Sequence, residues 1–288
     1  MSDFLKLLLG TVIIRPYVFI FLFVYLIASM CQIGWKNSLI YLVIGYLIAF
    51  LSEYSSIHCG FPYGLYVYVN KTAGRELWVA GVPFMDSLSY VFLAYCSFSM
   101  ALFLQSPVIK KGSEVLLLDT RAIRRSWQVL VLGALLMTFL DVIIDPVALL
   151  GSKWFLGKIY GYPDGGIYFG VPLSNFGGWF LVALVMIFCI QRLDSAIYST
   201  DRLDQIFSCL PWNSFIGVFL YVGIMGFNIT IGYLVKAYPL ALVNTLMSAL
   251  FMALAFSYTI FKIYHVNRDD LTTHLRDFPK ARASLLLP

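Results

Sequence analysis

The chain has 288 residues, of which 60% are hydrophobic and only 12% charged, and its mean hydropathy is +0.84. A soluble domain is usually about half apolar and a quarter charged, so this composition excludes an ordinary soluble enzyme and predicts an integral membrane protein. The net charge of +5 does not indicate a nucleic-acid partner, because no basic domain stands outside the hydrophobic segments.

Several hydrophobic segments approach the roughly 20 residues that a helix needs to cross a bilayer. The seven segments cover residues 13–30, 38–57, 79–105, 127–150, 174–190, 212–234 and 240–263. They leave no stretch for a separate soluble domain. We therefore expect an all-α, polytopic membrane protein with about seven transmembrane helices in one bundle, over residues 1–264. A basic cytoplasmic tail follows over residues 265–288.

The basic residues predict the orientation of this bundle. The side that holds the N-terminus and the loops after the second, fourth and sixth segments carries seven Lys and Arg, and the other side carries thirteen. Because positive charge is enriched in cytoplasmic loops, we expect a multi-pass protein of the cell membrane with its N-terminus outside and its C-terminus in the cytoplasm. Anionic lipids are expected to bind the basic inner face.

The acidic residues within the hydrophobic segments all fall in the outer half of the predicted bundle. Glu53 lies near the outer end of the second segment, and Asp86 lies in the outer turns of the third. Asp141 and Asp145 lie in the outer part of the fourth segment, and Asn175 opens the fifth on the same side. An ionisable group in hydrocarbon is costly, so an intramembrane carboxyl is a functional candidate. Their common depth predicts one site.

A structural interpretation of some of these residues is also open. Polar residues are cheapest at helix ends, so Glu53, Asn175 and Asn244 are also compatible with interfacial positions. Asp86 is also compatible with a cap on the third helix. Asp141 is the deepest carboxyl and is the hardest to explain as a structural residue.

Asp141 and Asp145 are four residues apart, which places them on one face of a helix. Two neighbouring carboxyls in a low dielectric cannot both ionise easily. The pair therefore predicts one protonated acid beside one carboxylate, which suits acid–base chemistry. A hydrogen-bonded pair that locks two helices together is the structural alternative. Pro146 is expected to bend or end the helix at this point.

Two outer loops contain similar sequences. Residues 60–68 read GFPYGLYVY and are followed by Gly-Val-Pro at 81–83, whereas residues 161–166 read GYPDGG and are followed by Gly-Val-Pro at 170–172. Both loops lead into a helix of the same direction, so they indicate either a parallel internal duplication or convergent use of turn residues. In either case we expect ordered, tyrosine-rich caps over the site.

The residue inventory excludes several kinds of membrane enzyme. The chain has three histidines, which are too few for a di-iron desaturase, and no lysine in the middle of the last segment for a retinal Schiff base. The sequence also lacks P-loop, GxSxG, HExxH and CxxC motifs. The five cysteines are scattered and predict no disulfide framework. No cofactor or metal is therefore expected.

The outer layer resembles a known family. Its features are Glu53, the 60–68 and 81–84 motifs, Asp141 and Asp145-Pro146, and the stretch 168–179, YFGVPLSNFGGW. These are similar to the carotenoid biosynthesis protein family, which includes the CruF-type carotenoid 1′,2′-hydratases. The resemblance implies addition of water, without a cofactor, to the terminal double bond of an acyclic carotenoid. It implies a membrane-dissolved acyclic carotenoid or polyprenoid as the substrate, with other carotenoid-pathway enzymes as candidate partners.

This chemistry suits the acidic layer. Asp141 is the expected acid, and Asp145 or Glu53 is the expected water-activating base, with Asp86 as a further catalytic candidate. The residues expected to bind the substrate are Tyr63, Tyr66, His58, Asp164, Tyr168, Asn175 and Trp179. Two other functions remain open. One is an intramembrane prenyltransferase that uses the DxxxD spacing of Asp141 and Asp145, and the other is a proton-coupled transporter.

Overall fold

The computed structural model describes residues 3–155, 157–196, 210–279 and 281–286. Within these residues it contains seven helices that are long and apolar enough to cross a membrane, and it has no soluble domain. The predicted class of a polytopic all-α membrane protein is thereby confirmed. Arg202, Cys209 and Lys280, which entered the charge and cysteine arguments, lie outside the described residues.

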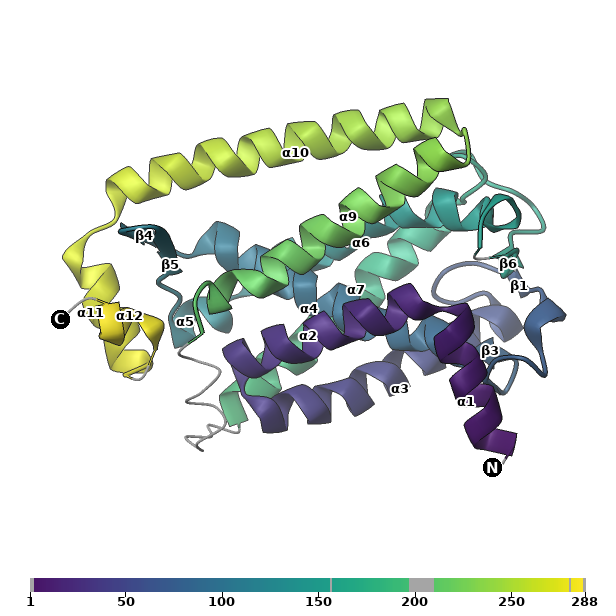
Figure 1. Cartoon of the computed structure of the whole chain (residues 1–288), viewed down its shortest axis with the longest axis horizontal. Helices are drawn as coiled ribbons and strands as arrows, with labels where there is room; N and C mark the ends of the chain where they lie inside the picture. The colour runs from purple at the N-terminus through teal and green to yellow at the C-terminus, as the bar shows by residue number, and fades with distance from the viewer. Residues whose placement is uncertain (1–2, 156, 197–209, 280, 287–288) are drawn as a thin grey trace.

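The long helices run side by side between two ends of the bundle (Figure 1). Following the orientation expected from the basic residues, we call the end with residues 67–68 and 160–161 the outer end and the end with residues 108–117 the inner end. They are α2 (Pro16–Ile33), α3 (Trp35–Cys59), α4 (Phe84–Gln105), α6 (Trp127–Leu149), α7 (Leu173–Ala196), α9 (Ile216–Leu234) and α10 (Tyr238–His265). The short 3₁₀ turn η3 (Asn213–Phe215) leads into α9.

One of the predicted boundaries is wrong for a physical reason. The first predicted segment, 13–30, crosses a helix break, since α1 (Asp3–Ile14) ends before Arg15 and α2 begins at Pro16. Proline starts a helix readily because its missing N–H would be unpaired there in any case. The fourth predicted segment, 127–150, agrees with α6, which continues through Pro146 to Leu149 and does not end at the proline.

Helix α4 forms the centre of the bundle. In its most apolar 18-residue window 89% of the residues are buried, compared with 28% for α2, α3 and α10. Small and hydroxylic residues let its neighbours approach closely, as is common between membrane helices. A Cβ added to Gly217 of α9 would lie 2.4 Å from the hydroxyl of Ser99, and one at Gly133 of α6 would lie 3.6 Å from Ala101.

The two similar outer loops adopt the same turn. Strands β2 (Trp78–Val79) and β3 (Val82–Pro83) form a hairpin around Ala80 and Gly81, and an isolated bridge joins Tyr168 to Val171 around Phe169 and Gly170. Both residues of each turn have positive φ, at 46° and 83° in the first and 49° and 91° in the second. Type I′ turns require this geometry, which glycine adopts without strain. The shared backbone favours an internal duplication.

These loops also pair with each other. Strand β1 (Val67–Tyr68) runs antiparallel to β6 (Tyr160–Gly161), with Tyr68 opposite Tyr160. Two 3₁₀ turns, η1 (Asn70–Thr72) and η2 (Gly151–Lys153), complete the outer connections. The helical hairpins α3–α4 and α6–α7 are thus joined at their outer ends by tyrosine-bearing strands.

Helix α1 packs against the first outer loop. Gly10 approaches so closely that an added Cβ would lie 2.0 Å from the carbonyl oxygen of Arg75. Arg15, at the break between α1 and α2, donates from Nε to Glu76 Oε2 at 3.0 Å and from Nη2 to Oε1 at 3.1 Å. Both side chains are fully buried, so this ion pair fixes the N-terminal helix to the loop.

The inner end is a small ordered cap. Strands β4 (Val108–Lys111) and β5 (Glu114–Leu117) form a hairpin that is followed by α5 (Arg121–Arg124). The C-terminal helices α11 (Arg268–Asp277) and α12 (Arg282–Leu286) lie beside them (Figure 1). Leu116, Leu118 and Ala283 form a small apolar core between them. The described part of the C-terminal tail is therefore packed against the hairpin.

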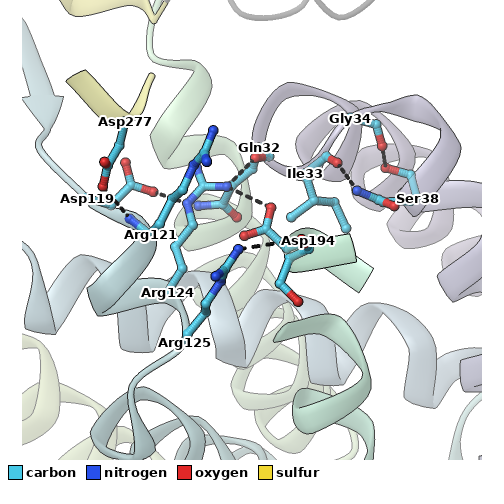
Figure 2. A network of polar contacts seen from close by, with 12 residues as sticks. Gln32, Ile33, Gly34, Ser38, Asp119, Arg121, Arg124, Arg125, Asp194 and Asp277 are labelled. Atoms are coloured by element: carbon cyan, nitrogen blue, oxygen red, sulfur yellow. Dashed lines mark hydrogen bonds and ion pairs between the residues drawn. The ribbon is translucent and has the colours of Figure 1, made fainter. Parts of the chain in front are cut away.

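A buried charge network holds this cap to the bundle (Figure 2). Arg124 donates to Asp119 at 2.6 Å, to Asp194 of α7 at 3.0 Å and to the carbonyl of Gln32 at 2.7 Å. His274 of α11 lies 3.5 Å from the same Asp119 carboxyl. Burial lowers the pKa of Arg124, but Asp119 and Asp194 raise it by more, so the guanidinium stays charged.

Candidate functional site

Asp141 and Asp145 on α6 meet Asn175 from the start of α7. The side-chain amide of Asn175 donates to Asp141 Oδ2 at 2.7 Å and to Asp145 Oδ2 at 3.0 Å. Asp145 also accepts hydrogen bonds from the hydroxyls of Tyr160 and Tyr162, the latter at 2.8 Å. Asp141, Asp145 and Asn175 are all buried. The structure thus joins the two predicted carboxyls through one shared amide.

A second cluster mirrors the first across the β1–β6 pair. Tyr68 donates to Asp86 Oδ2 at 2.7 Å and lies 3.1 Å from Glu53 Oε1, and Ser87 donates to the other oxygen of Glu53. A phenol has one proton and cannot donate it fully to two carboxyls. Both contacts of the Tyr68 hydroxyl are therefore hydrogen bonds only when one of the two carboxyls carries a proton and donates it to the phenol oxygen. Asp86 forms no cap, because α4 has no side-chain bond at its N-terminus.

Asp86 and Asn175 hold equivalent places in the two loops. Each follows the Gly-Val-Pro turn, three residues after Pro83 or Pro172. Asp86 accepts a hydrogen bond from Tyr68 in the second cluster, and Asn175 donates directly to Asp141 in the first. The repeated turn thus places one acid and one amide at matching positions.

The loop tyrosines are held as hydrogen-bond donors. Burial raises the pKa of the Tyr68 hydroxyl well above its usual value, and the carboxyls of Asp86 and Glu53 raise it further. Burial likewise raises the pKa of Tyr162, with Asp145 adding to the shift. Both hydroxyls therefore remain protonated over the range in which proteins are studied.

A polar cavity lies between the two clusters. It has an empty volume of about 310 Å³ and is lined by Glu53, Tyr63, Tyr66, Tyr68, Asp86, Tyr90, Asp145, Tyr160, Tyr162, Asn175 and Trp179. The rings of Tyr90 and Trp179 stack with their centroids 4.3 Å apart and 10° between their planes. Nearly every lining side chain carries a hydrogen-bonding group.

A larger apolar cavity adjoins it on the side of α2 and α9. Its empty volume is about 740 Å³. Its aromatic lining residues are Tyr17, Phe21, Phe92, Trp154, Tyr160, Trp179 and Phe227, and Asp86 and Asp141 are its acidic ones. Tyr17 and Phe227 stack at 5.4 Å. Asp141 reaches this cavity, whereas Asp145 faces the polar one.

In the part of the chain that the structure describes, no cation neutralises the carboxyls that line the two cavities. Among the described residues, neither Glu53, Asp86, Asp141 nor Asp145 takes part in an ion pair, and none of the residues lining either cavity is Lys or Arg. The field of the buried Arg15 reaches Asp86, but its guanidinium is bound to Glu76. Tyrosine hydroxyls, Ser87 and Asn175 are the partners instead.

The structure gathers most of the residues expected from the sequence around the cavities. Tyr63, Tyr66, Asn175 and Trp179 line the polar cavity with the carboxyls. The remaining three expected residues lie outside both cavities. His58 is exposed and bonds to the Tyr54 carbonyl at 2.7 Å, and Asp164 is exposed in the loop after β6. Tyr168 packs on Phe169 and Phe176.

Several lining residues were missed by the sequence reasoning. Tyr68, Tyr160 and Tyr162 belong to loops whose excess of tyrosine marked them as unusual, so their bonds to carboxyls had a sequence signal. Tyr17, Phe21 and Phe227 had none, because aromatic residues are common throughout a membrane helix. Their roles follow from the crossing of α2 and α9.

Comparison with known families matches residues 5–251 to the model of the carotenoid biosynthesis protein family. The chain belongs to that family. The resemblance found in the outer motifs is therefore confirmed, and the family match extends well beyond them. No curated protein and no solved structure matches the chain. As a member of this family the protein has a role in carotenoid biosynthesis.

Proposed function

We propose that the protein is a carotenoid hydratase, which adds water to the terminal double bond of an acyclic carotenoid. Membership of the carotenoid biosynthesis family supports the substrate class. The observation that carries the proposal is the placement of Asp141 in an aromatic, apolar cavity, directly beside a carboxyl that faces a polar cavity. Hydration needs these two environments next to each other.

The reaction begins with transfer of a proton to a hydrocarbon. A positioned acid protonates one alkene carbon and leaves a tertiary carbocation on the next. Aromatic faces stabilise such a cation without reacting with it, and Trp179 and Tyr17 present rings to the apolar cavity. A carboxylate then orients the attacking water and takes up its proton. The reaction is redox-neutral and requires no cofactor.

The hydrogen bonds support a division of labour between the two aspartates. Asp145 accepts three hydrogen bonds, from Tyr160, Tyr162 and Asn175, which is the pattern of an ionised carboxylate. Asp141 accepts one bond, at Oδ2, and its Oδ1 accepts none from the described residues. We therefore assign Asp141 as the acid and Asp145 as the base, with Glu53 and Asp86 as the second carboxyl cluster.

The apolar cavity suits one end of a polyene. Its wall is formed by α2, α4, α6 and α9 and is mainly aromatic and aliphatic. A diphosphate would require Lys or Arg, and the described lining residues include neither. The cavities therefore support a neutral hydrocarbon substrate over a prenyl diphosphate. Magnesium dependence would be the mark of the diphosphate alternative.

The test is mass spectrometry of pigments from a host that makes acyclic carotenoids, with and without the protein. A pigment heavier by one water molecule is the expected product. Asp141→Asn should lower its formation by about 10²–10⁴-fold, the usual contribution of a general acid. Asp164→Asn is the matched control, because it makes the same change in an exposed loop outside both cavities.

Unchanged pigments with a correctly inserted protein would contradict the hydratase proposal. Another acyclic polyprenoid would then be tested first, and a diphosphate-dependent transfer next. In the proposed orientation the N-terminus and the site lie on the outer side, and the cap at the other end faces the cytoplasm. Anionic lipids would bind that inner face.

A further inference from the structure

The two cavities share part of their lining. Among the described residues, Asp86, Tyr160 and Trp179 line the polar cavity and the apolar cavity alike. Tyr160 differs from the other two because its hydroxyl donates to Asp145. It is therefore the only one of the three that is bonded to the carboxylate assigned as the base.

The contrast between the linings indicates different occupants. Water occupies cavities whose walls offer two to four polar partners, and it avoids purely apolar ones. The polar cavity offers the hydroxyls of five loop tyrosines and three carboxyls. Tyr68 of β1 and Tyr160 of β6 are among its lining residues. These two strands lie at the outer end of the bundle (Figure 1). The apolar cavity instead lies among membrane helices.

We propose that the polar cavity is the vestibule through which water reaches the site from the outer side, and that Tyr160 is the catalytic residue that passes the proton of this water to Asp145. The proposal rests on the hydratase function and extends it with a separate route for each reactant. The hydrocarbon enters the apolar cavity from the bilayer, and water enters from the loops.

The step balances as follows. Asp141 gives its proton to one alkene carbon, the π electrons form the new C–H bond, and the adjacent carbon becomes a cation. Water beside Tyr160 attacks this carbon and forms the C–O bond. The water proton moves to the Tyr160 oxygen while Tyr160 gives its own proton to Asp145. Asp145 then holds a proton and Asp141 lacks one, and transfer of one proton from Asp145 to Asp141 restores the starting state before the next turnover.

Tyr162 provides a matched control within the same cluster. Its hydroxyl also donates to Asp145, at 2.8 Å, but Tyr162 lines the polar cavity and not the apolar one. If the tyrosines only hold the carboxylate in place, the loss of either hydroxyl should have a similar effect. If Tyr160 carries the proton, the two losses should differ widely.

The kinetic test compares Tyr160→Phe with Tyr162→Phe, after both variants are shown to melt at the same temperature as the wild type. Tyr160→Phe should lower turnover about 100-fold or more, as expected for loss of proton transfer, with little change in KM. Tyr162→Phe should lower it about tenfold, the lower end of the range for loss of one hydrogen bond to a charged group. Equal losses in the two variants would overturn the relay.

The water route is tested without activity. Cys59 is exposed at the outer end of α3, so a charged, membrane-impermeant thiol reagent should modify it from one face of the membrane. In a Cys59→Ser background, the same reagent applied from that face should modify Tyr162→Cys but spare Phe92→Cys in the apolar cavity. Modified peptides are identified by mass spectrometry.

The labelling result separates failure of the vestibule from failure of the proposed function. Protection of Tyr162→Cys, with Cys59 still modified in the wild type, would overturn the aqueous vestibule even if pigments are hydrated. Modification of Tyr162→Cys in a protein that leaves acyclic carotenoids unchanged would support the water route and contradict hydration.

Discussion

The carboxyls around Arg124 at the inner end and those around the cavities at the outer end have opposite kinds of partner. At the inner end, Asp119 and Asp194 surround Arg124, so each of these three charges has a partner of opposite sign (Figure 2). At the outer end, Asp141 and Asp145 share an amide and two tyrosines and have no cation among the described residues. Paired charges stabilise a fixed packing, whereas unpaired carboxyls keep the ability to gain and lose a proton.

The cost of burial explains why this difference is informative. An unpaired buried carboxylate is expensive, and Glu53, Asp141 and Asp145 are buried at the outer end with no ion pair among the described residues. The inner network holds helices and cap together and needs no further explanation. The outer clusters accept a cost that packing alone would not require, which supports their assignment to chemistry.

The same Asp→Asn substitution should lower stability much more at the inner end than at the outer end. Asp119→Asn should lower the free energy of unfolding by about 3 kcal/mol, the lower end of the range for breaking a buried pair, because Asp194 still neutralises Arg124. Asp141→Asn should leave stability nearly unchanged, since it replaces a neutral acid. Unfolding in detergent measures both, and a large loss in Asp141→Asn would contradict the comparison.

The shared amide of Asn175 should matter for the rate. Asn175→Ala removes both hydrogen bonds that order the aspartate pair. A hydrogen bond to a charged group contributes about 1.5–3 kcal/mol, so turnover should fall about 10- to 100-fold. Asn244→Ala is the control, because Asn244 is buried but bonds to the Ile143 carbonyl and lines neither cavity. Equal losses in both would indicate a general packing effect.

The smallest effect is expected at the rim of the inner cap. Arg282 donates to both carboxylate oxygens of Glu114 and holds the pKa of this carboxyl below its usual range. A lowered pKa stabilises the fold above the unfolded-state pKa, about 4.3, and the gain is lost as the pH falls through the folded-state value. Glu114→Gln should therefore melt slightly below wild type at pH 7, and the difference should vanish in acid.

Much of the outer site was visible in the sequence. Hydrophobic length and charge distribution predicted the spans, and orientation converted sequence position into depth. Glu53, Asp86, Asp141 and Asn175 were therefore expected in one layer, and the structure brings them to adjoining cavities. The spacing of Asp141 and Asp145 fixed their common helix face, because helical geometry is local.

Other features depended on contacts between distant segments. His58 and Asp164 belong to the same outer layer, yet both side chains are exposed and line neither cavity. Tyr17 and Phe227 lie 210 positions apart in the numbering and meet only because α2 crosses α9. The ordered inner cap also follows from packing of the C-terminal helices on the β4–β5 hairpin.

The sequence by itself determined the membrane class, the helical spans and the depth of the carboxyl layer, because hydrophobicity and helical periodicity act over a few neighbouring residues. Tertiary structure decided that Asp141 lines the apolar cavity, that Asp145 lines the polar one and that Tyr160 lines both. Depth in a membrane depends on position along a helix, but the partner of a side chain depends on how that helix is rotated against its neighbours.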